Sequence, residues 1–333
     1  MPTIASKPLP VSVDADRLTF GSLFSMSFMR TLRVAESGLN ALPPGLGRFH
    51  LRTVAQVADR ASADMVRRGG VALPIYQCEA LWMDFNAEVP VAVQIGAGMR
   101  CAVTGGTFVH QLHRRPQNYV NAIHQPWLDG FKTASGEVRQ FGAAPRGAGA
   151  TVEEQLSDAP PVGGIQIQLW ELTPEALARW RQQRENEMVA SCASLAYSVC
   201  ESGAMGLGAG GRIQQEIYRD RFKKSDWRAL PSARAWVHLV AAGHWFALTG
   251  ERAPSTPVDT DAYNRAKLPW FDYYDAELQD VAVSATLAGV QTVGALLDGG
   301  LEYAGATAVP PGDARVIRYG DRRADLVLPG DWG

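Results

Sequence analysis

The sequence predicts an α+β fold, with a β-rich N-terminal half built from antiparallel sheets of the sandwich or meander type and a helical C-terminal part. Short segments that alternate apolar and polar residues are concentrated before residue 172. After that point helical spacing dominates, and Thr173-Pro174 is a typical helix start, with Thr as the N-cap. The 33 Gly and 20 Pro residues among 333 indicate many turns, as short strands require.

The composition is that of a globular protein with a packed core, since 46% of the residues are hydrophobic and 20% are charged. The net charge of −2 provides no global basic field to attract nucleic acid or an anionic membrane, although it is compatible with a local basic patch. There is no apolar stretch of about 18 residues and no signal-peptide core. We therefore expect no membrane span and a cytoplasmic location, although export without a cleaved signal would leave the same sequence.

We expect four segments. Residues 1–10 carry three prolines and no periodic pattern, which is typical of a flexible arm. Residues 11–172 form the β-rich domain, and residues 173–300 form a helical part packed on it. Residues 301–333 form a C-terminal extension with short strands.

Within the β-rich half, period-two patterns and turn residues predict most of the elements. They are two strands in 11–34, an amphipathic helix over 54–68 stopped by Gly69-Gly70, a meander through 71–103, a hairpin over 131–141, a long surface loop over 142–164, and a last strand over 165–172 with one buried and one wet face.

The C-terminal half contains the predicted helices. They run from Thr173 to near Gly203, from Arg212 to Tyr218, from Ser232 to Leu248 with Gly250 closing the last turn, and around 284–297, and strand-like pieces follow at 316–319 and 325–328.

No metal site or cofactor is expected. The four cysteines form no C-x-x-C pair, which favours buried thiols. Three imidazoles, those of His110, His113 and His124, lie in one stretch and could ligate zinc if the fold brought them together. However, an offset of three places His110 and His113 on opposite faces of a strand, and no carboxylate at fixed spacing supports a metal.

One glycine-rich string is a candidate anion site. Gly206, Gly208 and Gly211 match G-x-G-x-x-G and precede the helix expected from Arg212, whose N-terminus could bind a phosphate. A dinucleotide site needs a buried strand directly before the glycines, and the preceding residues resemble the end of a helix instead. The alternative is a flexible or tightly packed glycine turn.

Aromatic residues beside carboxylates form two further candidates for a ligand site or an interface. Trp127 and Asp129 lie in one turn, and a second segment contains Trp270, Asp272, Tyr273 and Tyr274. Such groups could form an acid-base pair on a sugar-stacking platform. The alternative is packing, because a ring buries readily while its polar tip and the carboxylate satisfy backbone groups.

Several strings together resemble a group of bacterial and fungal proteins of unassigned activity. The resemblance spans about Arg30 to Val293 in the same order, which implies one inherited unit, and it brings no cofactor or catalytic residue to this chain. The strings are RTLR (30–33), PPGLGRF (43–49), YQCEALW (76–82), QPWLDG (125–130), VRQF (138–141), GLGAGGRIQQEIY (206–218) and LPWFDYYD (268–275).

No Gly-x-Ser-x-Gly string or papain-like cysteine occurs, so the sequence favours a non-catalytic binding or self-assembling structural protein. We expect a homo-oligomer with a glycan or protein ligand and no nucleic acid. The alternative is a hydrolase that acts on glycans through the aromatic-acidic turns. Two carboxylates about 5 to 10 Å apart in an aromatic-lined cleft would favour the hydrolase.

Overall fold

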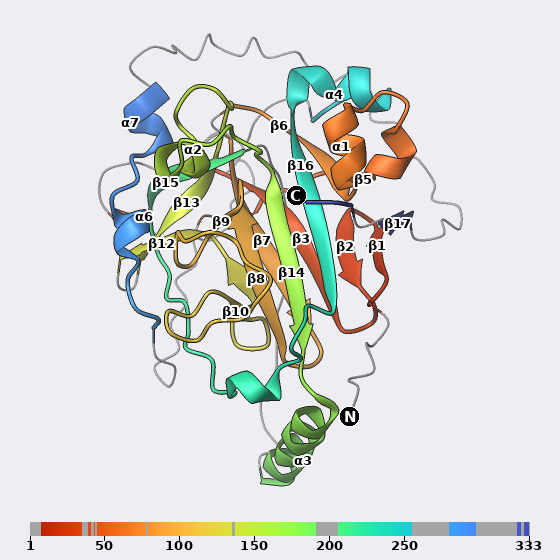
Figure 1. The fold of residues 1–333 in the computed structure, drawn as a ribbon, viewed down its shortest axis with the longest axis vertical. Helices are drawn as coiled ribbons and strands as arrows, with labels where there is room; N and C mark the ends of the chain where they lie inside the picture. Colours follow the sequence, from red (N-terminus) through yellow and green to blue (C-terminus); the bar gives the residue numbers. More distant parts are fainter. Residues whose placement is uncertain are drawn as a thin grey trace.

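The fold is α+β, with two β-sheets and helices around their edges (Figure 1). Within the described part of the chain, no helix is long and apolar enough to cross a membrane. The computed structural model describes residues 8–34, 39–40, 43, 45–77, 79–134, 137–190, 206–254, 280–297, 325–327 and 330–332.

The larger sheet has ten strands among these residues, in the order β17-β1-β2-β3-β7-β13-β15-β4, with β11 beside β7 and β12 beside β13. Its pairs are antiparallel except β15 with β4. Its strands are β1 (Val11–Asp14), β2 (Arg17–Phe20), β3 (Phe24–Thr31), β4 (Leu39–Asn40), β7 (Ala80–Ala87), β11 (Trp127–Leu128), β12 (Gly130–Ala134), β13 (Glu137–Ala144), β15 (Gly206–Gln214) and β17 (Asp325–Val327).

The smaller sheet has seven strands in the order β10-β8-β14-β16-β6-β5, with β9 beside β8. Its pairs are antiparallel except β16 with β6. Its strands are β5 (Arg52–Thr53), β6 (Val71–Ile75), β8 (Val91–Ala97), β9 (Arg100–Cys101), β10 (Val120–Asn121), β14 (Ile165–Glu171) and β16 (Ala233–Ala241).

The two sheets share one hydrophobic core. Phe28 and Met83 of the larger sheet belong to the same buried cluster as Ile167 and Val237 of the smaller one, and all four side chains are 0% exposed. Burying apolar surface contributes about 25 cal/mol per Å², so this shared layer stabilises the packing of the two sheets.

Helices lie at the two ends of the sandwich and along one side, where Figure 1 shows α6 and α7. Figure 1 shows α3 projecting at one end, and α1 and α4 together at the opposite end. The predicted start of α3 is confirmed, because Thr173 Oγ1 accepts a hydrogen bond from Ala176 N at 3.3 Å. The helices are η1 (Val54–Val57), α1 (Ala63–Arg68), α2 (Val152–Leu156), α3 (Pro174–Ala190), η2 (Lys224–Asp226), α4 (Ala242–Thr249), α6 (Ala285–Ala288) and α7 (Val293–Leu297).

The meander predicted for residues 71–103 is wrong for its first three strands, although these strands exist. Strands β6 and β8 belong to the smaller sheet and β7 to the larger. The last turn of the prediction is observed, because β8 and β9 are antiparallel neighbours in the smaller sheet. All residues of β6 and β8 are buried. Continuous apolar runs of this kind favour strands covered on both faces, and these strands therefore need not pair with their neighbours in sequence.

The solvent-exposed face predicted for the strand at residues 165–172 is also wrong. Gln166 and Gln168 of β14 are 0% exposed. Gln166 Oε1 accepts from Met99 N at 2.7 Å, and Gln168 Oε1 lies 2.9 Å from His110 Nδ1. The polar face of β14 is thus covered by neighbouring chain that pairs with most of its amide atoms, although Gln168 Nε2 has no partner among the described residues. Alternation in the sequence does not distinguish a face covered by protein from a face covered by water.

The helix predicted over Ser232 to Leu248 is half wrong. Residues 233–241 form β16, which pairs with β14 and β6, and only residues 242–249 form a helix, α4. Gly250 closes α4 in a left-handed conformation, φ 76°, as predicted. Because β15 and β16 lie inside the sheets, the expected β-then-helix layout is only partly observed.

Smaller differences concern element boundaries. Residues 11–34 hold three strands instead of two, and residues 54–68 hold a 3-10 turn and α1. Helix α2 interrupts the loop expected over 142–164. The hairpin of β12 and β13 is confirmed, and so is the strand at 325–327, whereas the piece at 316–319 lies outside the described residues.

Candidate functional site: a basic cleft

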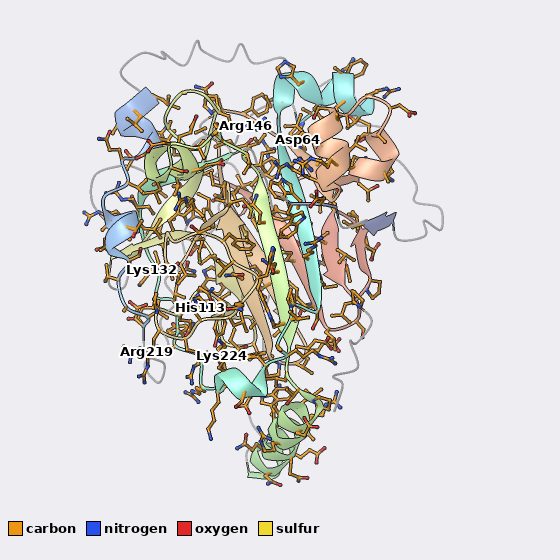
Figure 2. The ribbon with its side chains drawn as sticks, viewed as in Figure 1. Asp64, His113, Lys132, Arg146, Arg219 and Lys224 are labelled. Carbon is orange, nitrogen blue, oxygen red and sulfur yellow. The ribbon has the colours of Figure 1, made fainter. Side chains whose placement is uncertain are left out.

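A cavity of about 1070 Å³ lies at the end of the sandwich that carries η2 and α3. Figure 2 shows Arg219 and Lys224, two of its lining residues, near this end. Five cationic side chains and one carboxylate, Asp220, line it, together with Pro116, Gln117, Val281 and Ala282. We call this cavity the basic cleft; its cations are Arg114, Arg115, Arg219, Arg221 and Lys224.

The segment 219–221 supplies three of the lining residues, and buried and exposed side chains alternate along it. Tyr218 and Asp220 are buried, whereas Arg219 and Arg221 are exposed. Successive side chains of an extended backbone point to opposite sides, so an anchored Asp220 places both arginines outward.

Asp220 is the anchor of the cleft. Its carboxylate accepts hydrogen bonds from Tyr119 Oη at 2.7 Å, Trp227 Nε1 at 2.9 Å, Asn121 Nδ2 at 3.1 Å and the backbone N of Phe222 at 3.2 Å. Burial and the neighbouring Asp220 charge raise the pKa of the Tyr119 hydroxyl far above its usual range, so it stays protonated and donates. The carboxylate is therefore satisfied by neutral donors.

Gln117 joins the two segments that bring the cations together. Its Oε1 accepts from Asp220 N at 2.9 Å, and its Nε2 donates to the carbonyls of Tyr218 and Tyr119 at 3.0 and 2.9 Å. Arg114 Nη2 also donates to the carbonyl of Asp220 at 2.8 Å. Hydrogen bonds from buried amides specify one geometry, so the 114–117 and 219–221 segments are held in register.

The charge balance of the described lining favours an anionic ligand. Four guanidinium groups and one ammonium face one carboxylate that already accepts four hydrogen bonds. Guanidinium groups bind phosphate, sulfate and carboxylate oxygens through paired N–H donors, and a concave site concentrates their field. The described lining contains no aromatic ring on which a nucleobase or sugar could stack.

The structure brings the predicted residues Trp127 and Asp129 together, with Asp129 buried and Trp127 partly exposed. Trp127 Nε1 donates to Asp129 Oδ2 at 3.1 Å, and Gln215 Oε1 accepts from Asp129 N at 3.0 Å. Asp129 is 1% exposed, and burial raises the pKa of its carboxyl well above the usual range. This geometry fits the packing interpretation of the turn. The other four residues of this prediction, Trp270, Asp272, Tyr273 and Tyr274, lie outside the described residues.

The helix predicted after Gly206, Gly208 and Gly211 is wrong. Residues 206–214 form β15, which pairs with β13, so their backbone groups take part in strand pairing. No helix N-terminus is present at these residues to bind an anion. For a fourth glycine of this strand, Gly210, the reason is packing, because a Cβ there would lie 3.1 Å from the Cβ of Gln140 on β13. Glycine allows this close approach between strands.

The cysteine prediction is tested at one position. Cys101 is a free, buried thiol, and burial raises its pKa, as expected for a structural cysteine. Cys78, Cys192 and Cys200 lie outside the described residues.

Sequence reasoning missed the basic cleft. Its signal was present in two short basic strings, HRRP at 113–116 and RDRFKK at 219–224. The strings are about a hundred residues apart, and the net charge of −2 for the whole chain gives no indication of a local basic patch. Only the Asp220 and Gln117 hydrogen bonds reveal that they meet.

Comparison of the chain with family models, with curated proteins and with solved structures finds no match in any of the three.

Proposed function

We propose that the protein is a non-catalytic binding protein that holds a compact polyanion, with several phosphate or sulfate groups, in the basic cleft. The observation that supports this proposal is the convergence of five cationic side chains on one cavity of about 1070 Å³. Small-ligand pockets commonly measure about 300 to 1,000 Å³, so the cleft suits a small or oligomeric anion.

The lining also narrows the class of ligand. A nucleobase or a neutral sugar is usually held by stacking on aromatic rings, and the described lining contains none. Charge-assisted hydrogen bonds from arginine suit phosphate and sulfate groups instead. A sulfated oligosaccharide satisfies the same chemistry, which keeps the predicted glycan ligand within the proposal.

The carboxylate content of the basic cleft favours a binding function over glycan hydrolysis. A glycosidase uses two carboxyl groups about 5 to 10 Å apart, one of them free to act as an acid or base. The described lining offers only Asp220, and four donors occupy its oxygens. This carboxylate therefore organises the cleft, and the described lining lacks the second carboxyl group that a glycosidase needs.

The experiment is isothermal titration calorimetry with sodium tripolyphosphate. In the double variant Arg115→Gln/Lys224→Gln we expect at least a tenfold loss of affinity, because each charge-assisted contact contributes about 1.5 to 3 kcal/mol. The matched control is Arg60→Gln/Arg252→Gln, which removes the same charge from exposed positions outside the cleft.

Two further arms identify the ligand class. A sulfated disaccharide should compete with tripolyphosphate, whereas the neutral disaccharide should not. Affinity should fall as salt rises, because the contacts are ionic. Equal affinity in the cleft variant and the control variant, or competition by the neutral sugar, would contradict the proposal.

A further inference from the structure

A second cavity, of about 540 Å³, lies at the end of the sandwich opposite the basic cleft. Its walls come from α1, β6, β16 and the start of α4, and Figure 2 shows Asp64 and Arg146 in this region. The wall combines apolar side chains, among them Ile75, Val162 and Leu239, with a few polar groups. That combination is typical of a small-molecule site.

The first turn of α4 presents its backbone to this cavity. The N-cap, Ala241, makes no side-chain capping hydrogen bond, and residues 241–244 line the cavity. The first N–H groups of a helix have no partner within the helix and carry partial positive charge. A Cβ added at Gly243 would meet nothing within 4 Å, so there is free space beside these amides.

His238 provides a second, independent feature of the same wall. Its side chain is buried, at 9% exposure, and Nε2 lies 2.8 Å from the carbonyl oxygen of Gly69. A carbonyl only accepts, so Nε2 carries the proton and Nδ1 is left with a lone pair. Within the described part of the chain, Nδ1 has no hydrogen-bond partner.

The charges around His238 are those of Arg68, Asp64 and Arg146. Burial lowers the pKa of His238 to about 4, so the ring is neutral at pH 7 and Nδ1 is an acceptor. Asp64 is already paired with Arg67 and Arg68, at 2.6 and 2.9 Å.

Arg146 is the Lys or Arg residue in the described lining of this cavity. The residue is exposed, and its Nη1 donates to the carbonyls of Val162 and Pro161 at 3.1 and 3.4 Å. It forms no ion pair with any described residue. The wall therefore combines a guanidinium, the first turn of α4 without a side-chain cap, and a neutral acceptor.

We propose that this cavity binds a small hydroxy acid. The carboxylate lies against Arg146 and the first-turn N–H groups of α4, the hydroxyl donates to Nδ1 of His238, and the hydrocarbon part packs on Ile75 and Leu239. An ammonium group in place of the hydroxyl would need an unpaired carboxylate, and Asp64 is already engaged by two arginines. The site is separate from the basic cleft and does not depend on its ligand.

The test compares two acids that differ only in the hydroxyl, mandelate and phenylacetate, by calorimetry with each enantiomer of mandelate. One mandelate enantiomer should bind the wild-type protein about 5- to 10-fold more tightly than phenylacetate, the effect of one added hydrogen bond. Arg146→Gln should weaken both acids at least tenfold. His238→Phe should remove the difference between them, and Arg60→Gln should change neither.

A measurement on the wild-type protein covers the case in which His238→Phe does not fold. The ¹⁵N resonance of His238 Nδ1 should move toward the hydrogen-bonded range on addition of mandelate and stay in place with phenylacetate. Equal affinities of the two acids for the wild-type protein, no binding of either at 100-fold the protein concentration, or an unchanged Nδ1 resonance with bound mandelate would each overturn the proposal.

Discussion

Replacing Asp220 by alanine should both destabilise the fold and disorganise the basic cleft. The carboxylate accepts from three buried side chains, Tyr119, Asn121 and Trp227, and from the backbone of Phe222. The change leaves these donors without their acceptor. An unsatisfied buried polar group costs about 1 to 3 kcal/mol, and the costs overlap within one network, so we expect a loss of about 3 to 5 kcal/mol.

Urea unfolding followed by tryptophan fluorescence measures this loss. The midpoint should fall while the slope stays constant, because the surface exposed on unfolding does not change. Asp220→Asn, which keeps one acceptor oxygen, should lose less than Asp220→Ala. Asp158→Ala removes an exposed carboxylate elsewhere and should stay within about 0.5 kcal/mol of the wild type.

The same variant tests the link between the anchor and the cleft. Folded Asp220→Ala protein should bind tripolyphosphate more weakly, because Arg219 and Arg221 lose the fixed residue between them. A free-energy loss below about 1 kcal/mol for Asp220→Ala would refute the reasoning that this carboxylate is the buried hub.

Three further predictions concern other groups. Burial raises the pKa of Asp129, so the folded state holds this proton more tightly than the unfolded state, and its contribution to stability falls as pH rises above about 4. Asp129→Asn should therefore gain stability relative to the wild type as pH rises above about 4 in urea unfolding, and a difference that does not change with pH would contradict this. Burial lowers the pKa of His238 from 6.5 to about 4, so the free energy of unfolding should fall by at most about 3 kcal/mol as pH drops from 6.5 to 4, at about 1.4 kcal/mol per pH unit. His238→Gln should flatten the stability profile between these pH values. A variant profile parallel to that of the wild type would count against this role of His238. If residues 269–275 mediate self-association, Trp270→Ala/Tyr273→Ala should sediment as a smaller species with an unchanged circular dichroism spectrum, and an unchanged sedimentation coefficient would dismiss this interface.

The sequence predicted what local chemistry determines. Thr173-Pro174 starts a helix because a hydroxyl and a fixed φ suit the first turn, and Gly250 ends α4 because it adopts a left-handed conformation without strain. The β12 and β13 hairpin follows from alternation around a short turn. These features depend on neighbours in sequence.

The features that the sequence did not predict depend on residues that are far apart in the chain. Nothing local distinguishes a Gly-rich strand that packs closely on Gln140 from a Gly-rich loop, or a buried Gln168 from a wet one. An apolar run such as residues 233–241 fits a buried helix and a central strand equally well until its neighbours are known. The basic cleft was missed for the same reason, because Asp220 and Gln117 join strings that are individually unremarkable.

The most direct test of the central claim is to locate an anion in the protein. Crystals grown with sodium tungstate, an oxyanion that scatters anomalously, should show a peak in the basic cleft within about 3 to 4 Å of the Arg115 and Lys224 nitrogen atoms, and the Arg115→Gln/Lys224→Gln protein should lack it. Anomalous peaks confined to other surfaces of the wild-type protein, with the cleft accessible in the lattice, would contradict the account.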